Sequence, residues 1–320
     1  MLSSSLFETG YVPQLSGHET FPMRYGWLKK AYDAVQETRD LDENHSIFND
    51  VSAIARFGVG KNMVASIRHW ATQCDVIQSG RKGAAAEPGF VGDKIFAEGG
   101  MDPFMENPST LWLLHWKLAS NPHLTTWFWV FNHFSGDHFE RDTLVSALVK
   151  LGQERNWSRV TPSTIKRDVD CFVRTYVAKP ATNKQTHEDT MESPLTELSL
   201  IKPIGKKDGF RIIRGPKVTL GDGIFTFALI DFWAKSTSAN TLSFEAIAHK
   251  PGSPGKVFQL SEDDLVDRLS RIDAFTHGGI RWSETAGLKQ LVRSKPPSDI
   301  DISFYLAEDY STEHQGARGQ

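Results

Sequence analysis

One segment, residues 47–78, constrains the fold more than any other, because a glycine turn separates two stretches of helical periodicity. Gly58-Val59-Gly60 interrupts the pattern, since two glycines this close together favour a tight turn over a continuous helix. The segment therefore predicts a helix-turn-helix. Apolar residues recur on both sides at the spacing of an amphipathic helix: Ile47, Val51 and Ile54 before the turn, and Met63, Ile67, Trp70 and Cys74 after it.

The second of these predicted helices carries basic and polar residues on its outer side, namely Lys61, Asn62, Arg68 and His69. Such a helix is typical of DNA recognition, although a plain helical hairpin with a solvated basic face has the same pattern. A phosphate-binding loop at Gly60-Lys61 is a third interpretation. That loop needs a Ser or Thr after the lysine and a strand before the glycine, whereas Asn62 follows here and the preceding residues have a helical period.

Residues 161–176 repeat this pattern without repeating the sequence. Thr161 is placed to cap a helix whose first residue is Pro162. The apolar side of the helix is formed by Ile165, Val169, Phe172 and Tyr176. Its outer side carries Ser163, Arg167, Asp170 and Arg174, with Lys166 beside them, which makes it a second candidate recognition helix.

The chain has 320 residues, enough for two or three domains, and changes in composition suggest their boundaries. We predict an N-terminal winged-helix-like domain at 1–125, with a strand at 94–97 in its wing. A second helix-turn-helix domain with a basic hairpin is expected at 126–235. A C-terminal winged-helix-like domain and tail are expected at 236–320. The predicted fold class is mainly α with small β wings, in tandem winged-helix or helix-turn-helix units.

The end of the chain offers weaker signals. Leu288 and Leu291 are expected on a last helix, and residues 302–306 on a strand. Residues 202–217 alternate basic and apolar types, which suits a hairpin that contacts the DNA backbone, although a solvated edge hairpin is the alternative. The candidate contacts in this hairpin are Lys206, Lys207 and Arg211.

The composition limits the classes of function. The net charge is −3, so a DNA-binding surface has to be a local patch. Cys74 and Cys171 fall on apolar helical stripes and are predicted to be buried thiols rather than a disulfide. His115 is predicted to be a hydrogen-bonded core histidine. Neither a signal peptide nor a membrane span is recognisable, so we expect a cytoplasmic protein.

Residues 16–30, SGHETFPMRYGWLKK, contain the densest mixture of functional residue types. Hydrolysis of a phosphodiester needs groups that hold a divalent metal or activate water, and the candidate catalytic residues are His18, Glu19, Asp102 and Glu106, with Mg2+ or Mn2+ as the expected cofactor. We expect Asp102 and Glu106 to share one face of a helical turn that faces His18 and Glu19 across a groove. Alternatively, His18 and Glu19 only pin the N-terminal segment to the core. The candidate DNA contacts of this segment are Arg24, Lys29 and Lys30.

Four motifs carry a resemblance to a known family, namely SGHETFPMRYGWLKK, GVGKNMVASIRHW, DPFMENPSTLWLLHW and TPSTIKRDVDCFVRTY. Together they resemble a bacterial family of SspB-like proteins, first described as a domain of unknown function. The resemblance runs from about Leu15 to Arg293 and implies a role in DNA phosphorothioation, with nicking of one strand and defence against phage. It also implies partners: a cysteine desulfurase, an ATP-pyrophosphatase-like sulfur transferase and an ATPase.

The sequence thus favours a DNA-binding component of a phosphorothioation system that acts on double-stranded DNA. The resemblance favours a metal-dependent nickase. The lack of a recognisable nuclease motif favours the alternative, a non-catalytic DNA-binding adaptor or transcriptional regulator that recruits the sulfur-transfer enzymes.

Overall fold

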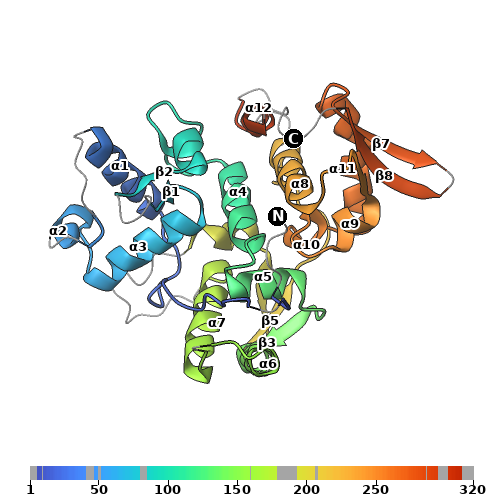
Figure 1. Cartoon of the computed structure of the whole chain (residues 1–320). Coiled ribbons are helices and arrows are strands. Elements are labelled where there is room, and N and C mark those ends of the chain that lie inside the picture. The colour runs from blue at the N-terminus through green and yellow to red at the C-terminus, as the bar shows by residue number, and fades with distance from the viewer. Residues whose placement is uncertain are drawn as a thin grey trace.

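Helices form most of the regular structure, and small antiparallel sheets accompany them (Figure 1). The predicted class, mainly α with small β elements, is confirmed. None of the helices in the described part of the chain is long and apolar enough to cross a membrane. The computed structural model describes residues 6–8, 10–40, 47–49, 52–79, 85–158, 160–178, 193–205, 208–285, 287–294 and 302–311.

The first part of the chain contains the predicted pair of helices with its glycine turn. Gly58 ends the first helix of the pair in the left-handed region, at φ +66°. Gly60 then starts the second helix, and a helix rather than a strand precedes it, which excludes the phosphate-binding loop. The elements of this part are α1 (Trp27–Asp40), α2 (Ala53–Phe57), α3 (Lys61–Gln73), β1 (Ile77–Gln78), β2 (Glu87–Pro88) and η2 (Gly92–Phe96).

The predicted strand at 94–97 is wrong, because residues 92–96 form the π-helix η2. Gly92 explains the close packing there: a Cβ at this position would lie 2.1 Å from the Val76 carbonyl oxygen and 2.6 Å from the Tyr32 ring. A short hairpin does follow α3, but it consists of β1 and β2, which pair antiparallel.

The apolar stripe before the turn is also partly wrong. The helix begins only at Ala53, so it buries Ala53 and Phe57 and leaves Ile54 half exposed. Val51 lies outside the described residues. His69, expected on the outer side of α3, is buried because it lies against the N-terminal segment at Gly17.

The second candidate recognition helix is confirmed as a helix. The Thr161 hydroxyl accepts the Thr164 N–H at 3.2 Å, Pro162 is the first helical residue, and the predicted apolar residues are all buried. β3, β5 and β4 form one antiparallel sheet in that order. The elements of this part are α4 (Pro108–Ala119), α5 (Thr125–Asn132), β3 (His138–Glu140), α6 (Arg141–Glu154), α7 (Pro162–Tyr176), η3 (Pro194–Leu198), β4 (Ile201–Ile204) and β5 (Gly209–Ile212).

The third part repeats this order of strand, helices and hairpin, and its hairpin projects from the body of the molecule (Figure 1). Two predictions fail here. Leu288 and Leu291 lie on the strand β8, which pairs with both β6 and β7, and residues 302–308 form a helix instead of a strand. The elements are α8 (Asp222–Ser236), β6 (Thr241–Ser243), α9 (Phe244–His249), α10 (Pro254–Val257), α11 (Glu262–Phe275), β7 (Ile280–Thr285), β8 (Leu288–Arg293) and α12 (Ile302–Glu308).

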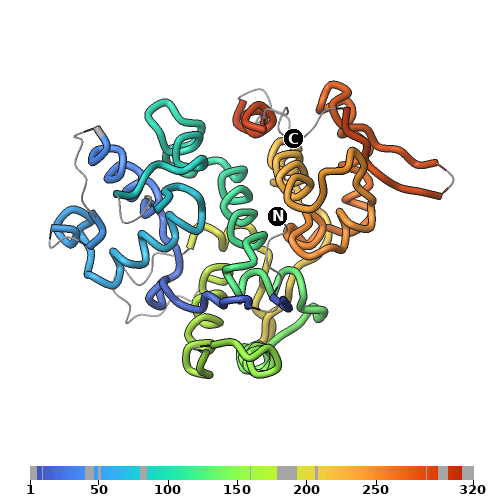
Figure 2. The backbone as a smooth tube through the Cα atoms, viewed as in Figure 1, coloured from blue at the N-terminus to red at the C-terminus, as the bar shows by residue number. Residues whose placement is uncertain are grey.

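A continuous apolar core joins the three parts. The apolar helices α4 and α8 lie at its centre and are linked where the Trp116 indole N–H donates to Asp231 at 2.9 Å. The first described residues run past the loop before α5, where the Tyr11 hydroxyl donates to Pro122 O at 2.7 Å, and then reach α3 (Figure 2). Cys74 and Cys171 are buried and free, as predicted.

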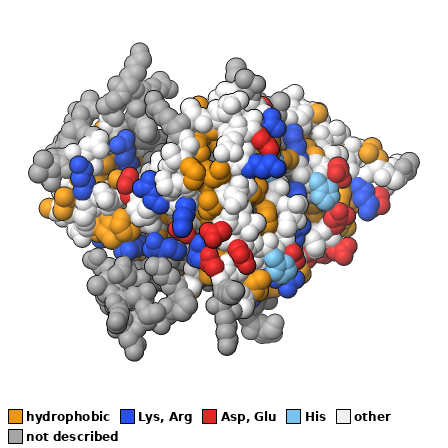
Figure 3. Space-filling view, turned by 90° about the horizontal axis from the view of Figure 1, so that it is seen from below, with side chains coloured by type: hydrophobic (Ala, Val, Ile, Leu, Met, Phe, Trp, Pro, Cys, Tyr) orange, Lys and Arg blue, Asp and Glu red, His pale blue; other side chains and the backbone are white. Residues whose placement is uncertain are grey.

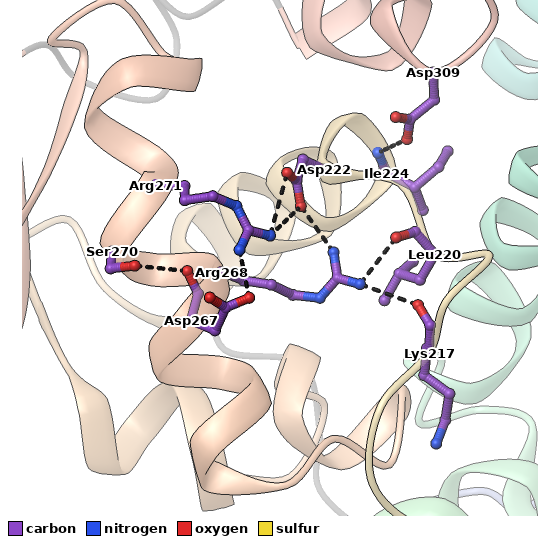
Figure 4. A network of polar contacts seen from close by, with 9 residues as sticks. All are labelled: Lys217, Leu220, Asp222, Ile224, Asp267, Arg268, Ser270, Arg271 and Asp309. Carbon is purple, nitrogen blue, oxygen red and sulfur yellow. Dashed lines mark hydrogen bonds and ion pairs between the residues drawn. The ribbon is translucent and has the colours of Figure 1, made fainter. Parts of the chain in front are cut away.

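Arg268 ties α11 to the start of α8 (Figure 4). Its guanidinium donates to Asp222 at 2.8 Å, to Lys217 O at 3.1 Å and to Leu220 O at 2.9 Å. Ile224, also near the start of α8, donates its backbone N–H at 2.7 Å to Asp309, which directly follows α12 (Ile302–Glu308). These contacts hold the start of α8 against α11 and the residue that follows α12.

Candidate nucleic-acid interface

The His18 side chain is the centre of a tight turn at residues 16–21. It is buried, and its Nε2 lies 2.8 Å from Oδ1 of Asp168 on α7, which is buried too. Its Nδ1 accepts the Thr20 N–H at 3.0 Å. An imidazole nitrogen that accepts a hydrogen bond carries no proton, so the proton of a neutral His18 is on Nε2 and is donated to Asp168.

The backbone of this turn holds α3 and α7 together. The Phe21 carbonyl accepts the Trp70 indole N–H at 3.0 Å on the α3 side, and the Thr20 carbonyl accepts from the Arg174 guanidinium at 3.1 Å on the α7 side. Glu19 and Thr20 both have a positive φ, +45° and +67°. A non-glycine residue in this region costs about 1 to 3 kcal/mol, so the surrounding contacts have to impose the turn.

The predicted catalytic residues do not form one group. His18 uses both ring nitrogens within the fold, and Glu19 is exposed beside it. Asp102 lies at the start of α4, where it accepts the N–H groups of Glu106 at 2.8 Å and Asn107 at 3.0 Å. The segment from Asp102 to Glu106 is a turn rather than a helix, so the shared helical face is absent. His18 instead packs near Trp127 of α5, beyond the other end of α4.

These residues do not fit a shared Mg2+ or Mn2+ site. Both oxygens of Asp102 accept hydrogen bonds, the second one also from the Thr110 hydroxyl at 2.5 Å. Across the described ranges, no group of three or more His, Cys, Asp or Glu residues is arranged to hold a metal ion. No catalytic step through a metal can therefore be assigned to His18, Glu19, Asp102 and Glu106.

The contacts of Asp102 indicate that it holds the turn that leads into α4, and this role is testable. Asp102→Ala should lower the free energy of unfolding by about 2 kcal/mol, because it leaves two backbone N–H groups without their acceptor. Denaturant unfolding measures the change. Glu106→Ala is the control, since its side chain is exposed, and should change stability by less than about 0.5 kcal/mol. An Asp102→Ala protein as stable as the parent would contradict this structural role.

Most of the predicted DNA contacts on α3 and α7 are accessible. Arg68 and Arg174 are half-buried at the edges of these helices. In Figure 3, which views the molecule from below, Lys and Arg side chains lie over the left half and also at the upper centre and right of the face, and Asp and Glu side chains lie mainly at its centre and right. The fully exposed predicted residues are Lys61, Asn62, Ser163, Lys166 and Arg167.

The basic residues of the N-terminal segment fit the prediction less well. Arg24 is buried, with its guanidinium 5.3 Å from the Trp27 ring centre and 5.7 Å from that of Phe21, so it does not face a ligand at the surface. Lys29 pairs with Asp33 at 2.5 Å on the same helix. Lys30 is exposed and donates to a backbone carbonyl at the end of α2.

The basic hairpin is formed by β4 and β5. Arg211 is exposed on β5, between Lys202 on one neighbouring strand and His138 on the other. Lys206 and Lys207 lie outside the described residues. Lys217, in contrast, is buried, donates to three backbone carbonyls at 2.9 to 3.3 Å, and has its pKa lowered to about 8 by burial. It holds the loop before α8 and is not part of a binding surface.

Sequence reasoning missed Asp168, the partner of His18. The residue stands in a basic motif, IKRDVD, where an acidic residue looks like part of the solvated side of a helix. It is one residue before the buried Val169, and this position next to the apolar stripe is the only local signal of burial. The pairing itself spans 150 residues of sequence and has no local signature.

Comparisons with known proteins agree with the motif resemblance. The model of the family described as "Protein of unknown function (DUF4007)" matches residues 15–310. A magnesium-bound crystal structure of SspB is similar to this chain with a TM-score of 0.82 and 27% identity, over 99% of this chain and 92% of that one. A second SspB crystal structure gives the same score and identity over 98% and 92%. No curated protein matches. The chain therefore belongs to the DUF4007 family and is an SspB-like protein.

Proposed function

We propose that the protein is a DNA-binding component of a DNA phosphorothioation system, and that α3 and α7 contact the same duplex. The single observation that carries the proposal is the turn at residues 16–21, which joins two outward basic helices. Trp70 on α3 and Asp168 and Arg174 on α7 all bond to this turn. A rigid connection of this kind sets the two helices at a constant distance, as recognition of neighbouring segments of a duplex requires. The likeness to SspB supports the role in phosphorothioation.

The order of elements supports a winged-helix interpretation of the second and third parts. In the second part, β3, α6, α7 and the β4–β5 hairpin follow one another, and β3 pairs with the second strand of the hairpin. In the third part, β6 pairs with β8 in the same way. In such a unit the helix before the hairpin is the one that enters the major groove, which makes α7 the recognition helix of the second unit.

The corresponding helix of the third unit, α11, has the opposite charge. Its sequence EDDLVDRLSRIDAF contains five acidic residues and two arginines, and both arginines pair with Asp222. Phosphate contacts need basic side chains, so α11 is a poor candidate for DNA binding. The proposed duplex contacts are therefore confined to the first two parts and to Arg211 of the β4–β5 hairpin.

Reversing two charges on α7 tests the proposal. The double variant Lys166→Glu with Arg167→Glu should bind duplex DNA about 10- to 100-fold more weakly and should lower the slope of log affinity against log salt by about 1.8, because two phosphate contacts are lost. Fluorescence anisotropy over a range of salt concentrations measures both. Both residues are exposed, so the fold should tolerate the change.

The matched control is the double variant Lys250→Glu with Arg281→Glu, which makes the same change of net charge in the third part of the chain. Both side chains are exposed there. If the α7 variant and this control weaken binding equally, the effect comes from total charge and α7 is not the interface.

A nickase and a non-catalytic adaptor remain the two forms of the proposal. The related SspB has been crystallised with magnesium, which favours the nickase. The engagement of His18 and Asp102 in structural hydrogen bonds favours the adaptor. Incubation with supercoiled plasmid, with Mg2+, with Mn2+ and with a chelator, separates them: metal-dependent conversion to open circles supports the nickase, and unchanged plasmid under conditions of tight binding supports the adaptor.

A further inference from the structure

A pocket of about 720 Å³ lies along the outer side of α3, beside the turn at residues 16–21. Its walls come from the N-terminal turn, from Phe48, Asn49, Ala53 and Ile54, and from α3 itself. Pockets of roughly 300 to 1,000 Å³ are the usual size for ligands such as a nucleotide. The side chains that line it decide which ligand chemistry it accepts.

Part of the pocket is apolar. Phe48 stacks on Phe57 behind it, with ring centres 5.3 Å apart, and Val64 of α3 is buried next to it. Ile54 is 50% exposed although it lines this wall, so apolar surface is available to a ligand. Flat aromatic bases gain stability on such a surface, because stacking and burial remove apolar area from water.

Two cations line the same pocket. Lys61 is exposed at the start of α3, and the Arg68 guanidinium lies 5.9 Å from the centre of the Phe48 ring. Neither forms an ion pair with a residue in the described part of the chain. His69 adds no charge, since burial lowers its pKa to about 3. The cations therefore favour an anionic group next to the apolar wall, as in a nucleotide.

Glu19 supplies the one carboxylate among the residues that line the pocket. The turn holds its backbone at a positive φ through the bonds of His18 and Thr20 to α7, so its position is set by the fold. A carboxylate accepts hydrogen bonds from the amino group of cytosine, whereas thymine presents a carbonyl oxygen at that position.

We propose that this pocket holds one unpaired nucleotide of DNA. The base packs on Phe48, Ile54 and Val64, the phosphates on either side of it pair with Lys61 and Arg68, and Glu19 selects bases that carry an amino group. This inference rests on the proposed DNA binding and specifies it, because a base can reach the pocket only when it leaves the duplex stack.

Three labelled DNAs test the proposal by fluorescence anisotropy: a perfect duplex, the same duplex with one extra unpaired cytosine, and the same duplex with an abasic site in place of that cytosine. The parent protein should bind the cytosine bulge about tenfold more tightly than the other two. Ile54→Ala should remove most of this preference. Leu288→Ala, a similar change at a side chain that is 55% exposed on the distant β8, should retain it.

Glu19→Gln tests the selection of the base. The parent should prefer an unpaired cytosine to an unpaired thymine by about tenfold, and the variant should lose this preference because a glutamine amide can also donate to thymine. If the parent binds the perfect duplex, the abasic bulge and both base bulges equally, the pocket does not hold a base, although DNA binding stands. If it binds none of the DNAs, the proposed function fails as well.

Discussion

Replacing Asp168 by alanine should lower the free energy of unfolding by about 3 kcal/mol, because it leaves the buried Nε2–H of His18 without an acceptor. The same change should weaken DNA binding. Without the bond between His18 and Asp168, the turn at residues 16–21 loses one of its two contacts with α7, and the positive φ values of Glu19 and Thr20 are less well supported. Denaturant unfolding and anisotropy with duplex DNA measure the two effects.

Two further variants separate the hydrogen bond from other effects of the substitution. Asp168→Asn keeps an oxygen that accepts the hydrogen bond of His18, so it should lower the free energy of unfolding by less than Asp168→Ala does. Asp170→Ala removes an acidic side chain that is 44% exposed on the same helix, and it should lower the free energy of unfolding by less than about 1 kcal/mol. If Asp168→Ala and Asp170→Ala lower the free energy of unfolding equally, the hydrogen bond between His18 and Asp168 is not important for stability.

The longer helices were predictable from sequence because their determinants are local. In α7, the Thr161-Pro162 start and the apolar spacing from Ile165 to Tyr176 lie within one element and specify it without reference to the remaining chain. The turn at Gly58 was predictable for a similar reason, since its left-handed backbone suits glycine.

Short elements were not predictable, because tertiary contacts decide them. Leu288 and Leu291 fit a helical spacing, but strand pairing with β6 and β7 holds them in β8. Residues 302–306 fit the pattern of a strand, yet they lie in α12, which packs on α8. In both cases the partner lies elsewhere in the sequence, so a local pattern cannot reveal it.

In the candidate site, too, some features followed from local sequence and others depend on tertiary contacts. The sequence indicated that His18, Glu19 and the basic residues of α3 and α7 are unusual, and the structure places His18 and Glu19 between these two helices. The sequence did not indicate which charged side chains are buried or form hydrogen bonds within the fold. Asp102 holds the turn before α4, and Arg24 is buried against aromatic rings, because of contacts that residue type and spacing do not specify.

Acid should destabilise the protein well before its carboxylates titrate, because three histidines are held neutral inside it. Burial is the main cause in each case, and it lowers the pKa of His115 to about 4, that of His69 to about 3 and that of His133 to about 4. In the unfolded chain these groups take up protons near pH 6.5, roughly the ordinary value. Below that pH the unfolded state binds more protons than the folded state, so the free energy of unfolding falls as the pH falls towards 4.

His115 gives the sharpest test of this pH dependence. It is fully buried, its Nε2–H donates to Val257 O at 2.8 Å, and its Nδ1 accepts from the Tyr176 hydroxyl at 2.9 Å. It alone should account for about 3 kcal/mol between neutral pH and pH 4. In His115→Gln, stability is lower at pH 7, but its dependence on pH should be flatter by about 1.4 kcal/mol per pH unit. The control His123→Gln changes an exposed side chain and should leave the slope unchanged. If the His115 ring proton signals of the folded parent titrate by NMR between about pH 6 and 7, the imidazole is not held neutral by burial and the prediction is wrong.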